Sequence, residues 1–129
     1  MSTIKVSAIQ DLSGGQNVNV PNAAKAWVNF NGEGTVTIRS DYNVSSITDN
    51  TTGDYTVNFT TAMADVNYSF NVNNYVGDDL GAGSAGYSRT ISVGSSDVTT
   101  SALTFVVYGH FPGFFGTKDT PNVCVTIFR

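Results

Sequence analysis

The chain has 129 residues, a formal net charge of −4 and a charged fraction of 12%, which is about half that of an ordinary soluble protein. This length fits one domain with one hydrophobic core. The six basic residues are scattered along the chain, so they form no phosphate-neutralising patch, and we expect no nucleic-acid partner. The abundant Ser, Thr, Asn and Gly disfavour helices and favour short strands. We therefore expect an all-β fold, an antiparallel, jelly-roll-like β-sandwich.

Alternation of apolar and polar residues with a period of two recurs along the first half of the chain. A strand is expected at residues 4–8, followed by a Gly- and Asn-rich arm at 11–22. Residues 25–39 predict a hairpin around an Asn-Gly turn, with a later glycine that allows a bulge or a longer loop. Residues 55–59 and 68–72 repeat the alternation with apolar side chains on one face. This pattern predicts a solvated antiparallel meander.

The C-terminal part of the sequence differs, because its strands are apolar on both faces. A Gly-rich stretch at 75–87 predicts a long exposed loop, and apolar residues then occupy both faces at 103–108 and 123–128. Such strands need cover from a second sheet with helices or from a neighbouring subunit. No segment reads as a helix, so a neighbouring subunit is the preferred explanation. The candidate interface residues are Val106, Cys124 and Phe128.

The single cysteine and the N-terminus indicate neither a disulfide nor a targeting segment. One cysteine cannot form an intrachain disulfide, and Cys124 lies in an apolar alternation that is typical of a small buried hydrophobe. The first residues contain no apolar core of a signal peptide, and no run of about 18 apolar residues occurs. We expect a protein that is not exported by a signal peptide and is not inserted into a membrane.

Potential catalytic or metal-binding motifs are weak. Gly81–Gly86 has the G-x-G-x-x-G spacing of a dinucleotide site, but a strand pattern follows it where a helix is required, which favours a flexible loop. His110 is the single histidine and no G-x-S-x-G motif occurs, so a ligand contact is a better hypothesis for it than catalysis. The neighbours Asp78 and Asp79 fit a solvated acidic loop, with weak calcium ligation as the alternative. We expect no catalytic residue, no metal site and no cofactor.

Three phenylalanines in the Gly/Pro-rich stretch 109–116 are the most informative feature. Large apolar side chains in a loop indicate an anchor against the same chain, a subunit contact or a ligand platform. As a platform, an aromatic ring would stack on the apolar face of a sugar while Asp or Asn side chains bind its hydroxyl groups. The sequence leaves these three alternatives open.

Four blocks carry a resemblance to a known family: Ala24–Gly32 (AKAWVNFNG), Val44–Asn50, Thr52–Met63 (TGDYTVNFTTAM) and Val123–Arg129. They closely resemble a domain of tail fibre and other virion-surface proteins of tailed bacteriophages, notably marine and cyanobacterial phages. The first residues look like the short piece that precedes this domain in its smallest members. The resemblance covers most of the chain except about residues 73–120, where members are expected to vary.

The resemblance implies a non-enzymatic virion structural protein, a homotrimeric tail fibre or fibre tip that is made in the host cytoplasm. Residues 1–24 would form an arm that attaches to other virion proteins, and residues 25–129 a β-sandwich tip domain that binds a host surface glycan or outer-membrane component. The alternative is a capsid decoration, head-fibre or tail adaptor protein with a purely structural role. A glycan-degrading tailspike is disfavoured because the chain shows no repeated rungs. The receptor-binding candidates in the variable region are Tyr75, Asp78, Asp79, Tyr87, Tyr108, His110, Phe111, Phe114 and Phe115.

Overall fold

The computed structural model describes residues 23–75, 88–111 and 113–129. Strands dominate these residues, and the one helical element among them is the short 3-10 turn η1 (Ser95–Asp97). In this described part, no helix is long and apolar enough to span a membrane. The strands are β1 (Ala24–Asn31), β2 (Thr37–Tyr42), β3 (Val44–Thr51), β4 (Asp54–Phe59), β5 (Ser69–Tyr75), β6 (Ser88–Ser92), β7 (Ala102–Phe111), β8 (Phe114–Thr117) and β9 (Asn122–Phe128).

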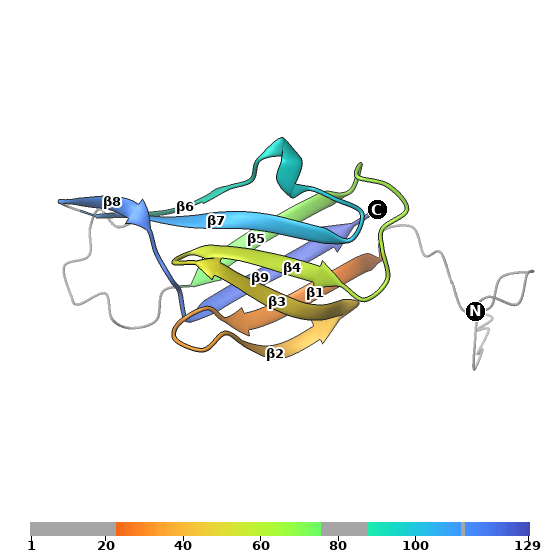
Figure 1. The fold of residues 1–129 in the computed structure, drawn as a ribbon, viewed down its shortest axis with the longest axis horizontal. Helices are drawn as coiled ribbons and strands as arrows, with labels where there is room; N and C mark the ends of the chain where they lie inside the picture. Colours follow the sequence, from red (N-terminus) through yellow and green to blue (C-terminus); the bar gives the residue numbers. More distant parts are fainter. Residues whose placement is uncertain (1–22, 76–87, 112) are drawn as a thin grey trace, which may run out of the picture.

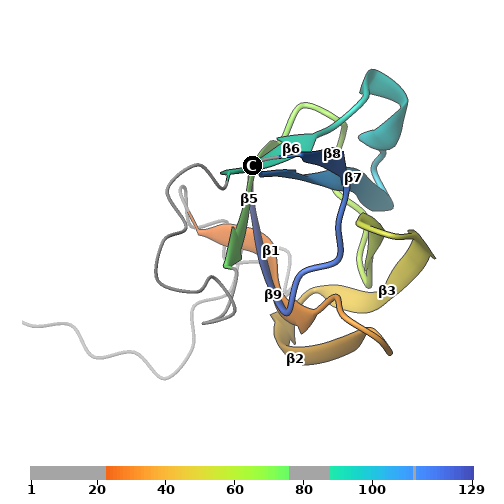
Figure 2. The ribbon, with the colours of Figure 1, turned by 90° about the vertical axis from the view of Figure 1, so that its left-hand side faces the viewer.

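These strands form two antiparallel sheets that pack face to face (Figures 1 and 2). Sheet A has the order β2-β1-β9-β5, so the first and the last strand lie side by side at its centre. Sheet B has the order β3-β4-β7-β6, and β8 pairs with β7. The expected all-β, two-sheet architecture is therefore confirmed.

The pairing confirms one sequence prediction and corrects another. The hairpin at 25–39 is present as β1 and β2, and its connection includes Gly34 with a φ of 63°, a value that glycine adopts without strain. The predicted meander is wrong, because β4 belongs to sheet B while β5 pairs with β9 in sheet A. Alternation shows which side chains face a core, but both sheets face the same core, so it does not show which strands are neighbours.

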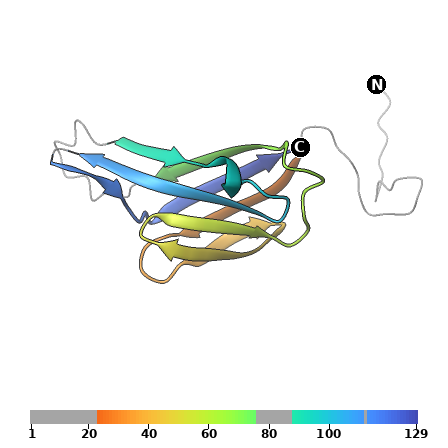
Figure 3. The same ribbon diagram turned by 45° about the horizontal axis from the view of Figure 1, so that its top comes forward.

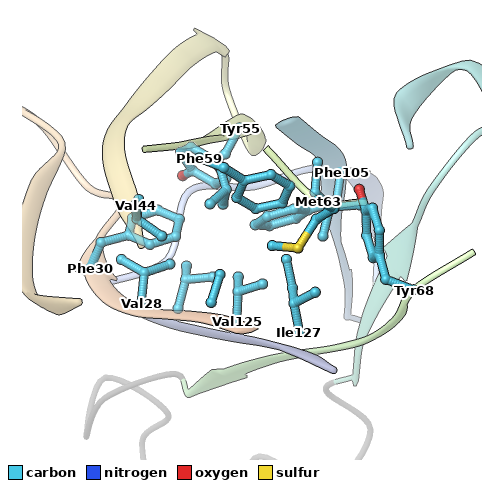
Figure 4. Close-up of a cluster of buried hydrophobic side chains, with 14 of the residues drawn as sticks. Val28, Phe30, Val44, Tyr55, Phe59, Met63, Tyr68, Phe105, Val125 and Ile127 are labelled. Carbon is cyan, nitrogen blue, oxygen red and sulfur yellow. The ribbon is translucent and has the colours of Figure 1, made fainter. Parts of the chain in front are cut away.

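The core lies between the sheets and is built from alternate residues of the central strands (Figure 4). Phe30 of β1 meets Tyr55 of β4 edge to face, with ring centroids 5.3 Å apart, and the tilted ring of Phe105 of β7 lies 6.0 Å from Tyr55. Burying each side chain of this size contributes about 1.5–3 kcal/mol. The most deeply buried side chains are Tyr55, Phe30, Phe105, Leu103, Ile127, Val28, Val57, Val107, Val123, Val125 and Thr120.

A polar cluster ties three connections together at one end of the sandwich. The buried Tyr55 hydroxyl donates to the carbonyl oxygen of Gly32, 2.8 Å away, and lies 3.0 Å from the Asp119 carboxylate. The same carboxylate oxygen accepts the backbone N–H of Gly53 at 2.7 Å. Burial raises the pKa of Tyr55 well above its usual value, and the Asp119 carboxylate adds to this effect. The β1–β2, β3–β4 and β8–β9 connections are thus linked through the Tyr55 hydroxyl and the Asp119 carboxylate.

Candidate binding site on the β7–β8 hairpin

The phenylalanine-rich segment is a hairpin. Strand β7 pairs with β4 up to Val106 and then continues from Tyr108 as the partner of β8. The sequence prediction of a loop over residues 109–116 is therefore wrong. Gly109 and Gly116 face each other within the pairing, and the intervening turn contains Gly113 with a φ of 85°. Gly113 supplies the positive φ that a tight turn needs, and Gly109 and Gly116 do not end the pairing.

Three of the predicted receptor-binding residues meet on the outer face of this hairpin. Val107 and Gly109 are buried, so alternation along β7 puts Tyr108 and His110 on the opposite, outer face. The rings of Tyr108 and Phe115 are stacked, with centroids 5.7 Å apart and an interplanar angle of 10°. The His110 ring meets Phe115 edge to face at 6.0 Å. We call these three residues the aromatic cluster.

The aromatic cluster is held by the backbone but remains open to solvent. Phe115 is 72% exposed, the highest value among the large hydrophobic residues whose exposure the structure describes. Its strand partner His110 is exposed as well. A ring that is fixed by a parallel neighbour and still exposed is suited to stacking on a ligand.

The remaining receptor-binding candidates lie elsewhere. Phe111 and Phe114 form the last backbone pair before the turn, which places them at the tip of the hairpin. Tyr75 ends β5 in sheet A, where it pairs with Asn122. Outside the described residues lie Asp78, Asp79 and Tyr87. The pairing of Ser88 with His110 shows that the chain enters β6 beside the aromatic cluster.

The predicted subunit-interface residues lie on opposite faces of the sandwich. Val106 is on the outer face of sheet B, partly buried, whereas Cys124 and Phe128 are exposed on the outer face of sheet A. The interpretation of Cys124 as a buried hydrophobe is wrong, because the neighbouring valines 123 and 125 take the inward positions. The Cys124 sulfur instead accepts the side-chain amide N–H of Asn29 at 3.0 Å.

Two sets of outward residues were missed in the sequence. On sheet A, Trp27 and Tyr42 are strand partners, 36% and 58% exposed. Trp27 alternates with buried residues of β1, which was the available signal for its outward position. On sheet B, polar side chains of β3, β4 and β7 form a connected network, which required knowledge of the strand pairing. This polar network consists of Asn50, Asp54, Thr56 and Thr104.

The polar network continues the face that carries the aromatic cluster. The side-chain amide of Asn50 donates to the Asp54 carboxylate and to the Thr56 hydroxyl, both at 3.0 Å. The Thr56 and Thr104 hydroxyl groups are 2.8 Å apart. Asp54 is the strand partner of Val106, two residues from Tyr108 along β7. Aromatic and hydrogen-bonding groups therefore share one continuous surface.

The fold and this surface define a two-sheet β-sandwich with an exposed aromatic cluster on a projecting hairpin. In the described ranges, no three or more His, Cys, Asp or Glu side chains come together as a metal site. No protein-family model, no curated protein and no solved structure matches this chain.

Proposed function

We propose that the protein is a bacteriophage virion protein, a tail fibre or fibre tip, that binds a glycan on the host surface without catalysis. The observation that carries the proposal is the exposed Phe115 ring stacked on Tyr108. The resemblance of the AKAWVNFNG and TGDYTVNFTTAM blocks to phage tail fibre domains supports the class of protein. The alternative location on a capsid or in a tail adaptor would make the same cluster a docking surface for another virion protein.

The chemistry of the aromatic cluster favours a sugar over an ionic ligand. The C–H face of a pyranose ring stacks on an aromatic ring, and the Tyr108 neighbour holds Phe115 in a fixed plane. A side chain that is already ordered loses less entropy when the ligand binds. Weak single sites of this kind reach useful avidity when several copies act together.

A homotrimer with a jelly-roll-like subunit is part of this proposal. Three of the exposed large hydrophobic residues, Trp27, Tyr42 and Phe128, share the outer face of sheet A. We assign the subunit contact to this face, together with Cys124, because contiguous exposed aromatic surface favours a protein contact. Val106 is then left on the opposite face, beside the aromatic cluster.

The test combines the solution mass of the full chain with its binding to a panel of marine bacterial cells, cyanobacteria included. Phe115→Ala should lower cell binding at least tenfold, about 1.4 kcal/mol, while leaving the solution mass unchanged. Val66→Ala, at a 49% exposed position in the β4–β5 connection and outside both proposed surfaces, is the control for cell binding. An oligomer that binds none of the cell types would favour the purely structural role. A Phe115→Ala protein that becomes monomeric would place the hairpin in the subunit interface.

A further inference from the structure

We infer that the ligand site extends from the aromatic cluster along the outer face of sheet B and takes an extended, neutral oligosaccharide chain. This inference rests on the proposed function and names its ligand class. The surface in question, the β7 strip, consists of the aromatic cluster, Val106 and the polar network of Asn50, Asp54, Thr56 and Thr104.

The first argument is geometric continuity. Strand β7 runs unbroken from the hairpin into sheet B, where β4 lies beside it (Figure 3). Thr104, Val106, Tyr108 and His110 alternate with buried residues, so all four face outward. Alternate residues of a strand are about 6.6–6.8 Å apart, so this row is about 20 Å long. That length exceeds a single sugar ring several-fold.

The second argument is the type of hydrogen-bonding group beside this row. Next to Val106, the Asp54 carboxylate accepts one bond from Asn50, and a carboxylate has about four acceptor sites. The Thr56 and Thr104 hydroxyl groups bond each other and keep further acceptor capacity. Carboxylate, amide and hydroxyl groups together can both accept from and donate to the neighbouring hydroxyl groups of a sugar. The network already orders these groups, which lowers the entropic cost of binding.

The third argument is charge, and it selects a neutral chain. The outward positions of β4 and β7 hold one carboxylate, Asp54, and no lysine or arginine. An anionic polysaccharide would meet the Asp54 charge without a compensating cation on either strand. A neutral polyhydroxylated chain meets no such repulsion.

The test measures affinity for neutral homo-oligosaccharides, glucans, mannans and galactans, from monosaccharides to octasaccharides, by calorimetry on the full-length protein. We expect affinity to rise with chain length for the preferred sugar. Asp54→Asn should lower the affinity for the longest oligomers about tenfold, because charge-assisted hydrogen bonds are about twice as strong as neutral ones. Asp54→Asn should leave the affinity for the shortest oligosaccharides unchanged, whereas Phe115→Ala should lower the affinity for oligosaccharides of every length.

Two further variants keep the test interpretable. Asp41→Asn removes an exposed carboxylate from β2 of sheet A and is the matched control, with no expected effect. Asp54 also accepts the Asn50 amide, so Thr104→Val, which removes one hydroxyl at similar volume, tests the same strip independently. Thr104→Val should likewise weaken only the longer oligomers, by about fivefold, the equivalent of one neutral hydrogen bond.

The outcomes separate this inference from the proposed function. Binding that depends on Phe115 but neither on chain length nor on Asp54 and Thr104 would overturn the β7 strip and leave the aromatic site standing. Phe115-dependent cell binding without affinity for any oligosaccharide would overturn the glycan ligand. Cell binding that does not depend on Phe115 would refute the proposed function itself.

Discussion

The buried Tyr55 hydroxyl offers the most direct test of how the sandwich is held together. Tyr55 is fully buried, and its hydroxyl is 2.8 Å from the Gly32 carbonyl oxygen and 3.0 Å from the Asp119 carboxylate. Tyr55→Phe keeps the ring and its aromatic neighbours but leaves both acceptors without this donor. A hydrogen bond to a charged group contributes about 1.5–3 kcal/mol. Since Asp119 is partly exposed and still accepts the N–H of Gly53, we expect a loss of about 2 kcal/mol.

This loss is measurable by equilibrium urea unfolding, followed by the fluorescence of the single tryptophan, Trp27. For a domain of this size, about 2 kcal/mol corresponds to a fall in Tm of about 8 °C. Tyr108→Phe is the matched control, because Tyr108 lies on the outer face of β7 and is partly exposed, and its effect should stay below about 0.5 kcal/mol. If Tyr55→Phe lowered the free energy of unfolding by less than about 0.5 kcal/mol, the stabilising role of the polar cluster would be refuted.

A double-mutant cycle with Gly32 sharpens the prediction. A Cβ added at Gly32 would lie 2.5 Å from the Tyr55 hydroxyl oxygen and 3.0 Å from the Thr120 carbonyl oxygen. Gly32→Ala should therefore destabilise the fold by about 1–3 kcal/mol through overpacking. Removing the hydroxyl relieves the closest contact, so the double variant should cost at least about 0.5 kcal/mol less than the sum of the single effects. Strict additivity would place the strain at the contacts that remain in the double variant, with the ring carbon Cζ of residue 55 at 2.8 Å and the Thr120 carbonyl oxygen.

Three further predictions concern pH and assembly. Burial raises the pKa of both Tyr55 and Tyr68 above 10.0, so above pH 10 the folded state keeps these protons while the unfolded chain loses them. The free energy of unfolding should therefore fall above pH 10 by up to about 1.4 kcal/mol per pH unit for each tyrosine. The fall should be less steep in Tyr55→Phe. Phe128→Asp should dissociate the oligomer in light scattering, because it places a charge in the proposed contact, while costing the 39% exposed position little in the isolated chain. The Cys124 thiol should react slowly with a disulfide reagent in the assembled protein and rapidly in the Phe128→Asp monomer; equal rates would show that sheet A is not the interface.

Much of the core was predictable from the sequence. The alternation in 55–59 correctly predicts that Tyr55, Val57 and Phe59 are buried, because a strand between core and solvent repeats every two residues. Strand β3 was missed, since Val44 is its single buried residue, Ile47 is only partly buried and the others are polar. An edge strand of this kind takes its conformation from pairing with β4, which leaves no periodic signal in its own residues.

The candidate site was predictable only in part, for a different reason. The aromatic composition of residues 108–115 pointed to Tyr108, His110 and Phe115, but their common face depends on the register of β7 with β8. Asp54 joins them through the pairing of β4 with β7, two strands that lie far apart in the sequence. Local patterns do not encode such long-range pairing, so the polar part of the surface had no detectable signal.

The same strand serves the core with one face and the proposed ligand site with the other. Leu103, Phe105 and Val107 are fully buried and fix β7 between the sheets. The alternate residues Tyr108 and His110 face outward and contribute no buried surface to that core. Substitutions on the outer face should therefore change ligand binding with small effects on unfolding, within about 0.5 kcal/mol for positions without buried bonds. This separation allows the aromatic residues to diversify while the sandwich that positions them stays the same.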